Sequence, residues 1–327
     1  MSSLYDDVAL MLHRSSVSKL KIEQTLRMFK KKIREHSEAA MYQSLSDEVK
    51  FNLCSMRILQ RDFSQWDGWQ YRDEWAAIMR YGVKSIPYWN GEYTEKLVVV
   101  GEQGIGDEVL WASCLPECSI RAKEVTYACD ERLLGIIQRN LRVNTKERKA
   151  DAREDLLGGF TAYIPAGDLF PLFRRRLGDF PRKPYLKPLH ERIPEFEKYR
   201  GKTGVSWQGR HGYIDPMELG IKDAVSLQYD GFHPEIETPD IDLRNDIEGV
   251  YALISVLDRV VTVPTSVMHF AGSMGKKCEI ILTPHDSELE TYFVVDEIDW
   301  HVPLGVSPYY PNSVVYKDIS SWRKACG

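Results

Sequence analysis

One segment, Lys96 to Pro116, constrains the fold of this chain more than any other, because it joins an apolar run, a glycine loop and a helical pattern. Leu97 to Val100 are apolar without interruption, which is typical of a parallel strand covered on both faces. Gly101, Gly104 and Gly106 follow, and glycine lets a backbone turn and approach a ligand where a Cβ would obstruct it. The segment therefore predicts a buried strand, a tight loop and a helix, the arrangement that binds ligands in open α/β sheets.

The order of these glycines argues against a dinucleotide-binding fingerprint. That fingerprint is G-x-G-x-x-G, whereas the chain has G-x-x-G-x-G. Asp130, after the next predicted strand, could still imitate the acid that binds a ribose in dehydrogenases. A dehydrogenase stays open as an alternative, as does the interpretation that the loop is only a tight connection.

Asp107 comes directly after the glycine loop, beside backbone amides and the start of the predicted helix. A carboxylate in that place lies where ligands bind in open sheets, which marks a site but not yet a reaction. It can equally cap the helix, since aspartate is a preferred capping residue. The sequence therefore marks Asp107 as a candidate site residue and leaves both roles open.

The composition is that of a soluble globular chain, long enough for about two domains. Of 327 residues, 43% are hydrophobic and 28% are charged, and the net charge of −5 gives no general attraction to nucleic acid or anionic lipid. The short basic run Arg174 to Arg176 fits a solvated helix face. No apolar stretch reaches the length of a membrane span, and the polar start lacks the core of a signal peptide. We therefore expect a cytoplasmic protein with no membrane span and no nucleic-acid partner.

The six cysteines fall mostly within apolar helix or strand patterns. Cys114 and Cys118 form a pair, but no second pair follows at metal-site spacing. We predict reduced thiols in the core and no metal site.

Residues 1–82 have a helical pattern, which predicts a helical cap on the rest of the chain. Ser46 has the character of an N-cap, and Val49, Leu53 and Met56 recur at helical spacing. Tryptophans as dense as those that follow usually pack an interface between layers, and a stacking platform for bases or sugars is the alternative. The aromatic cluster consists of Phe63, Trp66, Trp69, Tyr71 and Trp75.

The rest of the chain alternates strand and helix signals in two blocks, which predicts two α/β lobes with parallel sheets. A proline-rich connection joins the blocks and is typical of a linker. A cleft between two such lobes suits a nucleotide-containing ligand, because open sheets bind ligands at the carboxyl ends of their strands. The predicted strands are Leu97–Val100, Val125–Cys129, Ala162–Ile164, Thr203–Trp207, Ala224–Gln228, Arg259–Val263 and Glu279–Leu282, with helices near Glu248–Leu257 and Ser266–Met274.

The second block has a strand, loop and helix junction of its own. The strand ends at Val263, Pro264 turns the chain, and Thr265 and Ser266 offer hydroxyls and backbone amides where a helix begins. Such a helix start suits an anion, and phosphate fits it best. His269 lies one turn later on the same face, although a lone histidine on a helix is more often simply packed.

A series of motifs along the chain resembles the glycosyltransferase module found after tetratricopeptide repeats in many bacterial proteins. That module is related to the lipopolysaccharide heptosyltransferases and, more distantly, to the protein O-GlcNAc transferases. The motifs run in the same order through most of the chain, and this order makes the resemblance specific. They are D-F-S-Q-W-D-G-W-Q-Y-R-D-E-W (62–75), P-Y-W-N-G-E (87–92), G-E-Q-G-I-G-D-E-V-L-W-A-S (101–113), G-V-S-W-Q-G (204–209), V-S-L-Q-Y (225–229), D-I-E-G-V-Y-A-L-I-S-V-L-D (246–258), T-S-V-M-H-F-A-G-S-M-G-K (265–276) and S-P-Y-Y-P (307–311).

The resemblance implies an α/β fold of the GT-B type, with two Rossmann-like lobes and an N-terminal helical, TPR-like extension. The implied divisions are a cap at 1–82, an acceptor-side lobe at 93–180 and a nucleotide-sugar lobe at 201–327. The implied reaction is inverting, metal-independent transfer of a sugar from a nucleotide sugar to an acceptor hydroxyl, with no cofactor besides that co-substrate. The acceptor could be a saccharide, a lipid-linked saccharide or a protein hydroxyl.

Residue roles also follow from the resemblance. Asp107 matches the position of the general base in the heptosyltransferases. Thr265, Ser266 and the amides of their helix start would hold the diphosphate, with His269 nearby as a donor. The other residues expected around the donor nucleotide are Gly104, Gly106, Ser206, Trp207, Gln208 and Gln228.

The chain departs from the family pattern at several donor positions. Family members commonly have Asp where this chain has Pro264, and the segment 208–224 is shortened. Gly249 and Val250 replace the polar residues that usually begin the next helix. A catalytically silent GT-B protein, acting as a binding or scaffold module, is therefore the alternative to an active enzyme.

Overall fold

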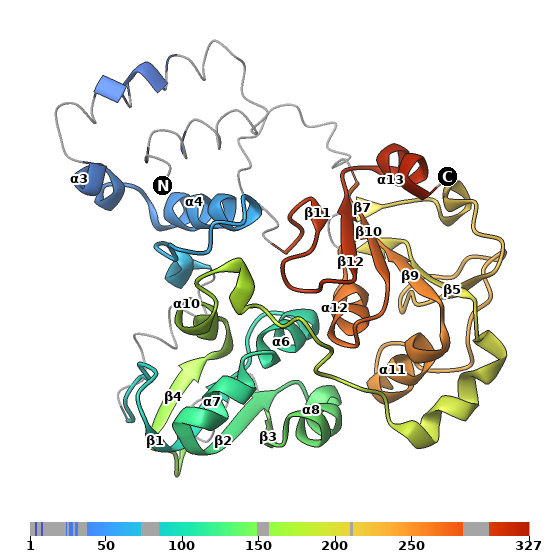
Figure 1. The fold of residues 1–327 in the computed structure, drawn as a ribbon, viewed down its shortest axis with the longest axis horizontal. Coiled ribbons are helices and arrows are strands. Elements are labelled where there is room, and N and C mark those ends of the chain that lie inside the picture. The colour runs from blue at the N-terminus through green and yellow to red at the C-terminus, as the bar shows by residue number, and fades with distance from the viewer. Residues whose placement is uncertain are drawn as a thin grey trace.

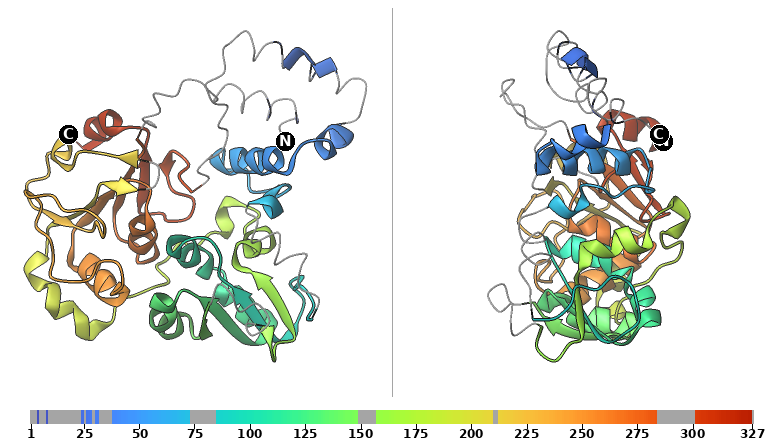
Figure 2. Two further views of the ribbon diagram at one scale, coloured as in Figure 1. Left: turned by 180° about the vertical axis from the view of Figure 1, so that it is seen from behind. Right: turned by 90° about the vertical axis from the view of Figure 1, so that its left-hand side faces the viewer.

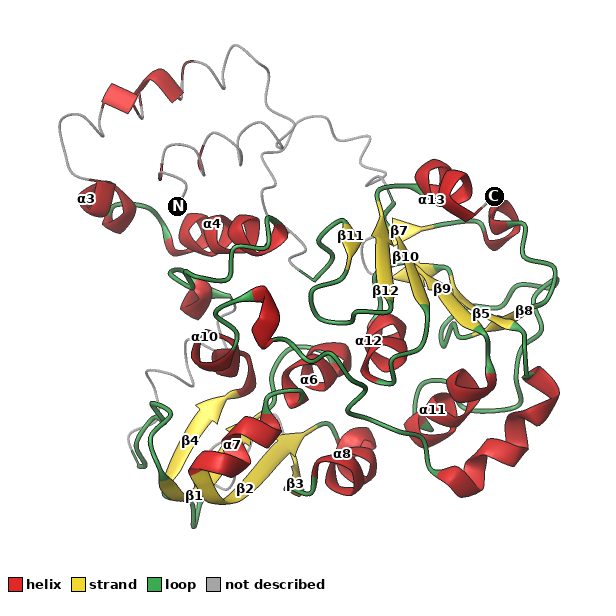
Figure 3. Ribbon diagram, in the orientation of Figure 1, coloured by secondary structure: helices red, strands yellow, loops and turns green. Residues whose placement is uncertain are grey.

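The computed structural model describes residues 38–72, 85–148, 157–209, 212–283 and 301–326, together with scattered positions before residue 38. Within these residues the chain forms two separate, mainly parallel sheets with helices packed beside them, and a helical segment lies next to the first sheet (Figures 1 and 3). The prediction of an α/β fold with two parallel sheets is confirmed.

The first sheet holds four parallel strands in the order β3-β2-β1-β4. β1 pairs with a strand on each side, and its last four residues, Leu97–Val100, have no exposed surface, as their uninterrupted apolar run predicts. The strands are β1 Thr94–Val100, β2 Ala122–Cys129, β3 Asn144–Glu147 and β4 Ala162–Pro165, and the helices are α6 Ile105–Ala112, α7 Leu115–Arg121, α8 Leu134–Leu141 and α10 Leu169–Phe173.

The second sheet holds six strands in the order β11-β12-β10-β9-β5-β8, and all pairings are parallel except that of β11 with β12. A two-stranded ribbon, β6 Gln208–Gly209 and β7 Gly212–Tyr213, follows the end of β5. The strands of the sheet are β5 Thr203–Ser206, β8 Ala224–Ser226, β9 Arg259–Thr262, β10 Cys278–Ile281, β11 Gly305–Val306 and β12 Ser313–Tyr316, and the helices are α11 Ile247–Val256, α12 Ser266–Ser273 and α13 Ile319–Cys326.

The helical segment contains α3 Glu38–Gln43, α4 Asp47–Leu59 and a short 3₁₀ helix, Trp69–Tyr71. Ser46 caps α4 as predicted, because its Oγ accepts a hydrogen bond from the Val49 amide at 3.3 Å. α4 is buried on more than one face, so it packs between neighbours. The tetratricopeptide character of residues 1–82 stays a prediction.

The helical segment packs on the first lobe through two tryptophans. Trp69 is 1% exposed and its Nε1 donates a hydrogen bond to the Gly167 carbonyl at 2.8 Å. Trp66 Nε1 donates to the Arg174 carbonyl at 3.1 Å. The prediction of an interface is confirmed for these two rings, and a stacking platform is wrong for them because they are buried. Trp75 lies outside the described residues.

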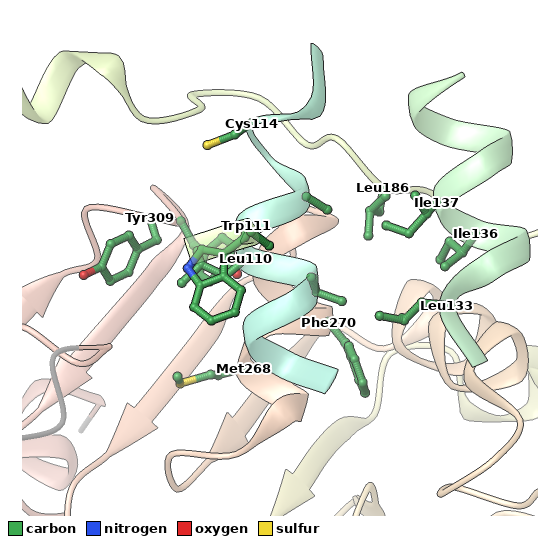
Figure 4. Packing of buried hydrophobic residues seen from close by; sticks show 14 of the residues in the cluster. Leu110, Trp111, Cys114, Leu133, Ile136, Ile137, Leu186, Met268, Phe270 and Tyr309 are labelled. Atoms are coloured by element: carbon green, nitrogen blue, oxygen red, sulfur yellow. The ribbon is translucent and has the colours of Figure 1, made fainter. Parts of the chain in front are cut away.

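The two lobes contact each other through α6 and α12, which lie side by side between the sheets (Figures 1 and 2). Leu110 of α6 and Phe270 of α12 belong to one continuous buried core (Figure 4). A second contact joins α8 to the start of α11, where Arg139 pairs with Glu248 at 2.7 Å. These contacts fix the carboxyl ends of the strands of one lobe relative to those of the other.

Some elements were not predicted, and one basic residue was misjudged. β3 is a polar edge strand, so it lacks the apolar pattern of a buried strand. The solvated interpretation of the basic run is wrong for Arg174, which is 1% exposed. α10 ends before it, and its guanidinium turns inward to donate to the Ser113 carbonyl at 2.8 Å and to pair with Glu117. Arg175 remains exposed, as expected.

Candidate active site

Loops that follow parallel strands of both lobes meet where α6 and α12 begin. The loop Gly101–Gly104 follows β1, and the loop Val263–Thr265 follows β9. The residues after β5 lie against the second loop, since an ideal Cβ at Gly209 would lie 2.7 Å from the Pro264 carbonyl oxygen. This meeting of strand ends is the place where open α/β sheets bind ligands.

Gly106 allows the two helix starts to touch. An ideal Cβ at this position would lie 2.6 Å from the His269 ring, closer than a real Cβ can come, and 3.1 Å from Ser266 Cα, which is a tight contact. At Gly104 a Cβ would instead have the Asp107 carboxylate at 3.2 Å as its neighbour. The sequence predicted room for a ligand at both glycines, and at Gly106 the space next to the backbone is taken by α12.

The Asp107 carboxylate, at the third position of α6, is bonded through both of its oxygens. Oδ2 accepts the Gly104 amide at 3.0 Å, so Asp107 helps to cap the helix by bonding back to the N-cap residue Gly104 and is not itself the N-cap. Oδ1 lies 2.6 Å from His301 Nε2. Because an ionised carboxylate only accepts hydrogen bonds, Nε2 must carry the proton in that contact.

The surroundings of Asp107 keep it ionised. Burial by itself raises the pKa of the carboxyl, but the charge and hydrogen bond of His301 oppose burial, and His269 and the Gly104 amide act in the same direction. The pKa of Asp107 therefore lies below its usual range. The carboxylate still has 17% of its side-chain surface exposed, so it is not sealed from a ligand.

The sequence gave no sign of His301 as a site residue. It lies 194 residues away from Asp107, in a turn that precedes β11, and it belongs to no motif quoted above. Its ring centroid is 5.5 Å from that of His269. The structure therefore brings Asp107, His269 and His301 together, and the last of these could have been found only from the tertiary fold.

The start of α12 is formed as predicted. Thr265 is its N-cap, and the Thr265 Oγ1 accepts the Val267 amide at 3.3 Å. Thr265 and Ser266 are only half-buried, so the first amides of the helix lie near the surface of the site. His269, on the next turn, is 4% exposed, and its Nδ1 lies 2.9 Å from the Tyr310 hydroxyl.

The predicted nucleotide-pocket residues of the second lobe lie together, and Gln228 connects them. Its Oε1 accepts hydrogen bonds from Ser206 Oγ at 3.1 Å and from the amides of Trp207 at 3.1 Å and Gln208 at 3.0 Å. Gln228, Ser206 and Trp207 are all buried, whereas Gln208 is exposed. These contacts make Gln228 a support for the loop after β5, and the Gln208 side chain is the member of the group that reaches solvent.

Glu108, next to Asp107, turns the other way and joins three strand ends. It has no exposed surface, accepts the Asp130 amide at 2.7 Å and pairs with Arg148 at 2.8 Å. Burial raises the pKa of the Glu108 carboxyl to about 7, although Arg148 opposes this. A Cβ at Gly101 would overlap the Glu108 carboxylate, which explains the first glycine of the loop.

Glu102 ties the same loop to the helical segment. Arg72 reaches it from beyond α4: the Arg72 Nε donates to Glu102 at 3.0 Å and the Arg72 Nη1 donates to Asp168 at 2.7 Å. The Arg72 and Glu102 side chains have no exposed surface. Tyr88 also donates to Asp168, at 2.8 Å. The glycine loop is therefore anchored from outside its own lobe by a buried, charged network.

Among the described residues, no group of three or more histidine, cysteine or acidic side chains is placed to hold a metal ion. Within the same residues, no helix has the length and apolar character needed to cross a bilayer. Five of the cysteines are buried and Cys326 is exposed, and all six are free.

Comparisons with known proteins give distant similarities. No family model matches the chain. Protein FlbA of Caulobacter vibrioides is 24% identical over 263 residues, which cover 64% of this chain and 44% of that protein, so the chain spans less than half of that relative's length. A glycosyl transferase family 9 structure from Veillonella parvula is 13% identical with a TM-score of 0.45, covering 73% of this chain and 92% of that one. The ADP-heptose lipopolysaccharide heptosyltransferase II of E. coli is 12% identical with a TM-score of 0.45, and the match covers 68% of this chain and 90% of that one. Similarity at this level does not establish membership of a family.

Proposed function

We propose that the chain is a glycosyltransferase of GT-B architecture, which moves a sugar from a nucleotide sugar to an acceptor hydroxyl with inversion and without a metal. One observation carries the proposal: an ionised carboxylate, Asp107, and an anion-ready helix start, Thr265 and Ser266, belong to helices that touch at Gly106. The ordered motifs of the sequence support the same reaction. We also propose a cytoplasmic site of action.

The proposed chemistry places a base beside a cradle for the leaving group. Asp107 takes the proton of the acceptor hydroxyl while the acceptor oxygen forms a bond to the anomeric carbon. The bond from that carbon to the diphosphate breaks on the opposite side, and the nucleoside diphosphate leaves with the electron pair. The lowered pKa of Asp107 keeps the carboxylate ionised at neutral pH, the form that can accept a proton, and it also makes the group a weaker base than a carboxylate with a raised pKa.

The start of α12 would stabilise the leaving diphosphate. Backbone amides at a helix N-terminus and the helix dipole favour negative charge. Thr265 and Ser266 add hydroxyls at the same place, and His269 lies one turn further along. A role for Ser206, Trp207, Gln208 and Gln228 in binding the nucleotide remains part of the proposal, with Gln228 acting through the loop that it supports.

A thermal-shift measurement with UDP, GDP, CDP and ADP tests the donor site. A ligand at a hundred times its Kd stabilises the folded chain by about 2.7 kcal/mol, so at least one diphosphate should raise the melting temperature. Ser266→Glu should abolish that shift, because it places a negative charge at the helix start. Ser119→Glu, on an exposed position of α7, is the matched control and should retain it. If no diphosphate changes the melting temperature of the wild type, the donor site is rejected.

A silent GT-B binding module is the second candidate, and the capping contact of Asp107 favours it. The Gly104 amide already bonds to Oδ2, so Asp107 has a structural use that needs no reaction. The two candidates differ in turnover: a module binds a nucleotide sugar without releasing a diphosphate. A dehydrogenase receives no support, because the Asp130 carboxylate is engaged within its own turn. It caps the 3₁₀ helix Glu131–Leu133 by accepting the Arg132 amide, and it pairs with the Arg132 guanidinium at 2.7 Å.

A further inference from the structure

His301, which belongs to none of the sequence motifs, is in direct contact with the proposed base Asp107. Its Nε2 lies 2.6 Å from Asp107 Oδ1, and the side chains of His301 and Asp107 are 18% and 17% exposed. Both groups therefore lie at the edge of the site rather than in the core. A ligand in the site can therefore reach this pair.

The helical segment holds the turn that carries His301. Arg61, two residues beyond the end of α4, donates through Nη2 to the Leu304 carbonyl at 3.0 Å and also to the Val306 carbonyl. β11, which contains Val306, has only two residues and pairs on one side with β12. A strand this short gives little stability by itself, so the Arg61 contacts add to the burial of Val302 in holding the turn.

Other groups also face Asp107. His269 comes from α12 and lowers the pKa of Asp107 together with His301. Tyr310, which follows the turn, lies close enough for the Asp107 charge to raise the pKa of the tyrosine, although burial is the larger cause. The Gly104 amide completes the shell. His301 bonds directly to the carboxylate through its side chain.

We propose that His301 is a positioning residue for Asp107, and that the helical segment keeps it in place through Arg61. The proposal rests on the function proposed above. With Oδ2 bonded to Gly104 and Oδ1 to His301, both oxygens of the carboxylate are held and the group keeps one orientation in the site. The helical segment thus becomes part of the machinery that orients the base.

The proposal predicts a specific change in the pH dependence of transfer. Transfer falls as the pH drops through the pKa of Asp107, because the protonated carboxyl cannot act as a base. His301 lowers that pKa. Removing His301 should therefore move the acid limb of kcat to higher pH, an effect that lost packing alone would not produce.

Steady-state kinetics of His301 variants test whether His301 contributes to transfer. His301→Leu should lower kcat about tenfold to a hundredfold with little change in KM for the donor, because a misplaced base affects the reaction more than binding. His301→Gln keeps a donor to the carboxylate and should retain most of kcat. Arg61→Met should lower kcat in the same direction by about tenfold or less. His190→Gln, on an exposed histidine, is the control and should match the wild type.

An NMR titration of the Asp107 carboxyl carbon, assigned with Asp107→Asn, gives a readout independent of turnover. In His301→Leu the pKa of Asp107 should rise relative to the wild type. If the titration, kcat and the acid limb are all unchanged in His301→Leu, the positioning role is rejected. If the pKa rises but the wild type transfers no sugar from any nucleotide sugar, the proposed function is rejected and the pair is a structural contact.

Discussion

The starts of α6 and α12 touch each other, yet they are held in place differently. The loop before α6 and its first turn carry three neighbouring acids, Glu102, Asp107 and Glu108, and each contacts a basic side chain distant in sequence. The partners are Arg72, His301 and Arg148, which come from three separate parts of the chain. The start of α12 depends on a local contact, in which Thr265 accepts the amide two residues ahead.

The difference suits two kinds of chemistry. Charged groups held by distant partners keep one orientation, and at Asp107 the partners also favour the ionised state, which a general base needs. A helix start with neutral hydroxyls and half-buried amides presents positive potential without its own charge, which suits an anion that enters and leaves. Changes at the α6 side should therefore reach through the fold, and changes at the α12 side should stay local.

The largest effect is expected at Arg72, because it lies between two buried acids. Arg72→Met would leave Glu102 and Asp168 without this partner and should reduce the free energy of unfolding by about 3–5 kcal/mol. Arg175→Met, on an exposed arginine, should change it by less than about 0.5 kcal/mol. Urea unfolding of both variants measures the difference. Equal stabilities would show that the distant anchor is not needed.

A smaller effect is expected from Glu108, and it depends on pH. The pKa of this carboxyl is raised from 4.5 to about 7 in the folded chain, so folding takes up a proton between these values. Its contribution to stability is therefore lost as the pH rises from 4.5 to 7, by up to about 3 kcal/mol.

Urea unfolding of Glu108→Gln at several pH values tests this sign. The stability of the wild type should fall relative to that of Glu108→Gln as the pH rises to 7. Glu124→Gln, on a half-exposed strand position, should run parallel to the wild type. If the stability of Glu108→Gln also changed with pH in parallel with that of the wild type, the raised pKa of Glu108 would be contradicted.

The smallest effect is expected at the α12 start. Thr265→Ala removes the cap and should cost about 1 kcal/mol, whereas Thr265→Ser keeps a hydroxyl and should stay close to the wild type. Thermal unfolding without ligand measures both. A loss as large as that at Arg72 would show that the α12 start also depends on distant contacts.

The same contrast explains what the sequence could predict. The sequence predicts the ends of β9, α11 and α12 to within one residue, and it predicts the end of β1 but not its longer start. These predictions succeed because apolar periodicity and helix caps are local signals. The Thr265 cap was found in the same way. The basic partners of Glu102, Asp107 and Glu108 could not be predicted, because no local sequence pattern indicates that a distant residue will pair with a given acid. These partners are Arg72, His301 and Arg148.

Glycine was the least predictable element of the site. The loop was correctly placed between a strand and a helix, although α6 begins at Ile105 and so includes Gly106, and the sequence could not say what would approach these glycines. The structure places the Glu108 carboxylate at Gly101 and the His269 ring at Gly106. The residue with a left-handed backbone in this loop is Gln103, with φ 56°, rather than a glycine.

The most direct test of the account is the transfer activity of Asp107→Asn, measured with the nucleotide sugar whose diphosphate stabilises the wild type. Asparagine has one side-chain oxygen, which can keep the Gly104 or the His301 contact but not both, so a loss of about 1 kcal/mol in stability is expected while nucleotide binding is retained. Release of the diphosphate in the presence of acceptor should fall by about 10²–10⁴, the usual contribution of a positioned base. Retained transfer in Asp107→Asn would contradict the account and assign Asp107 to capping alone.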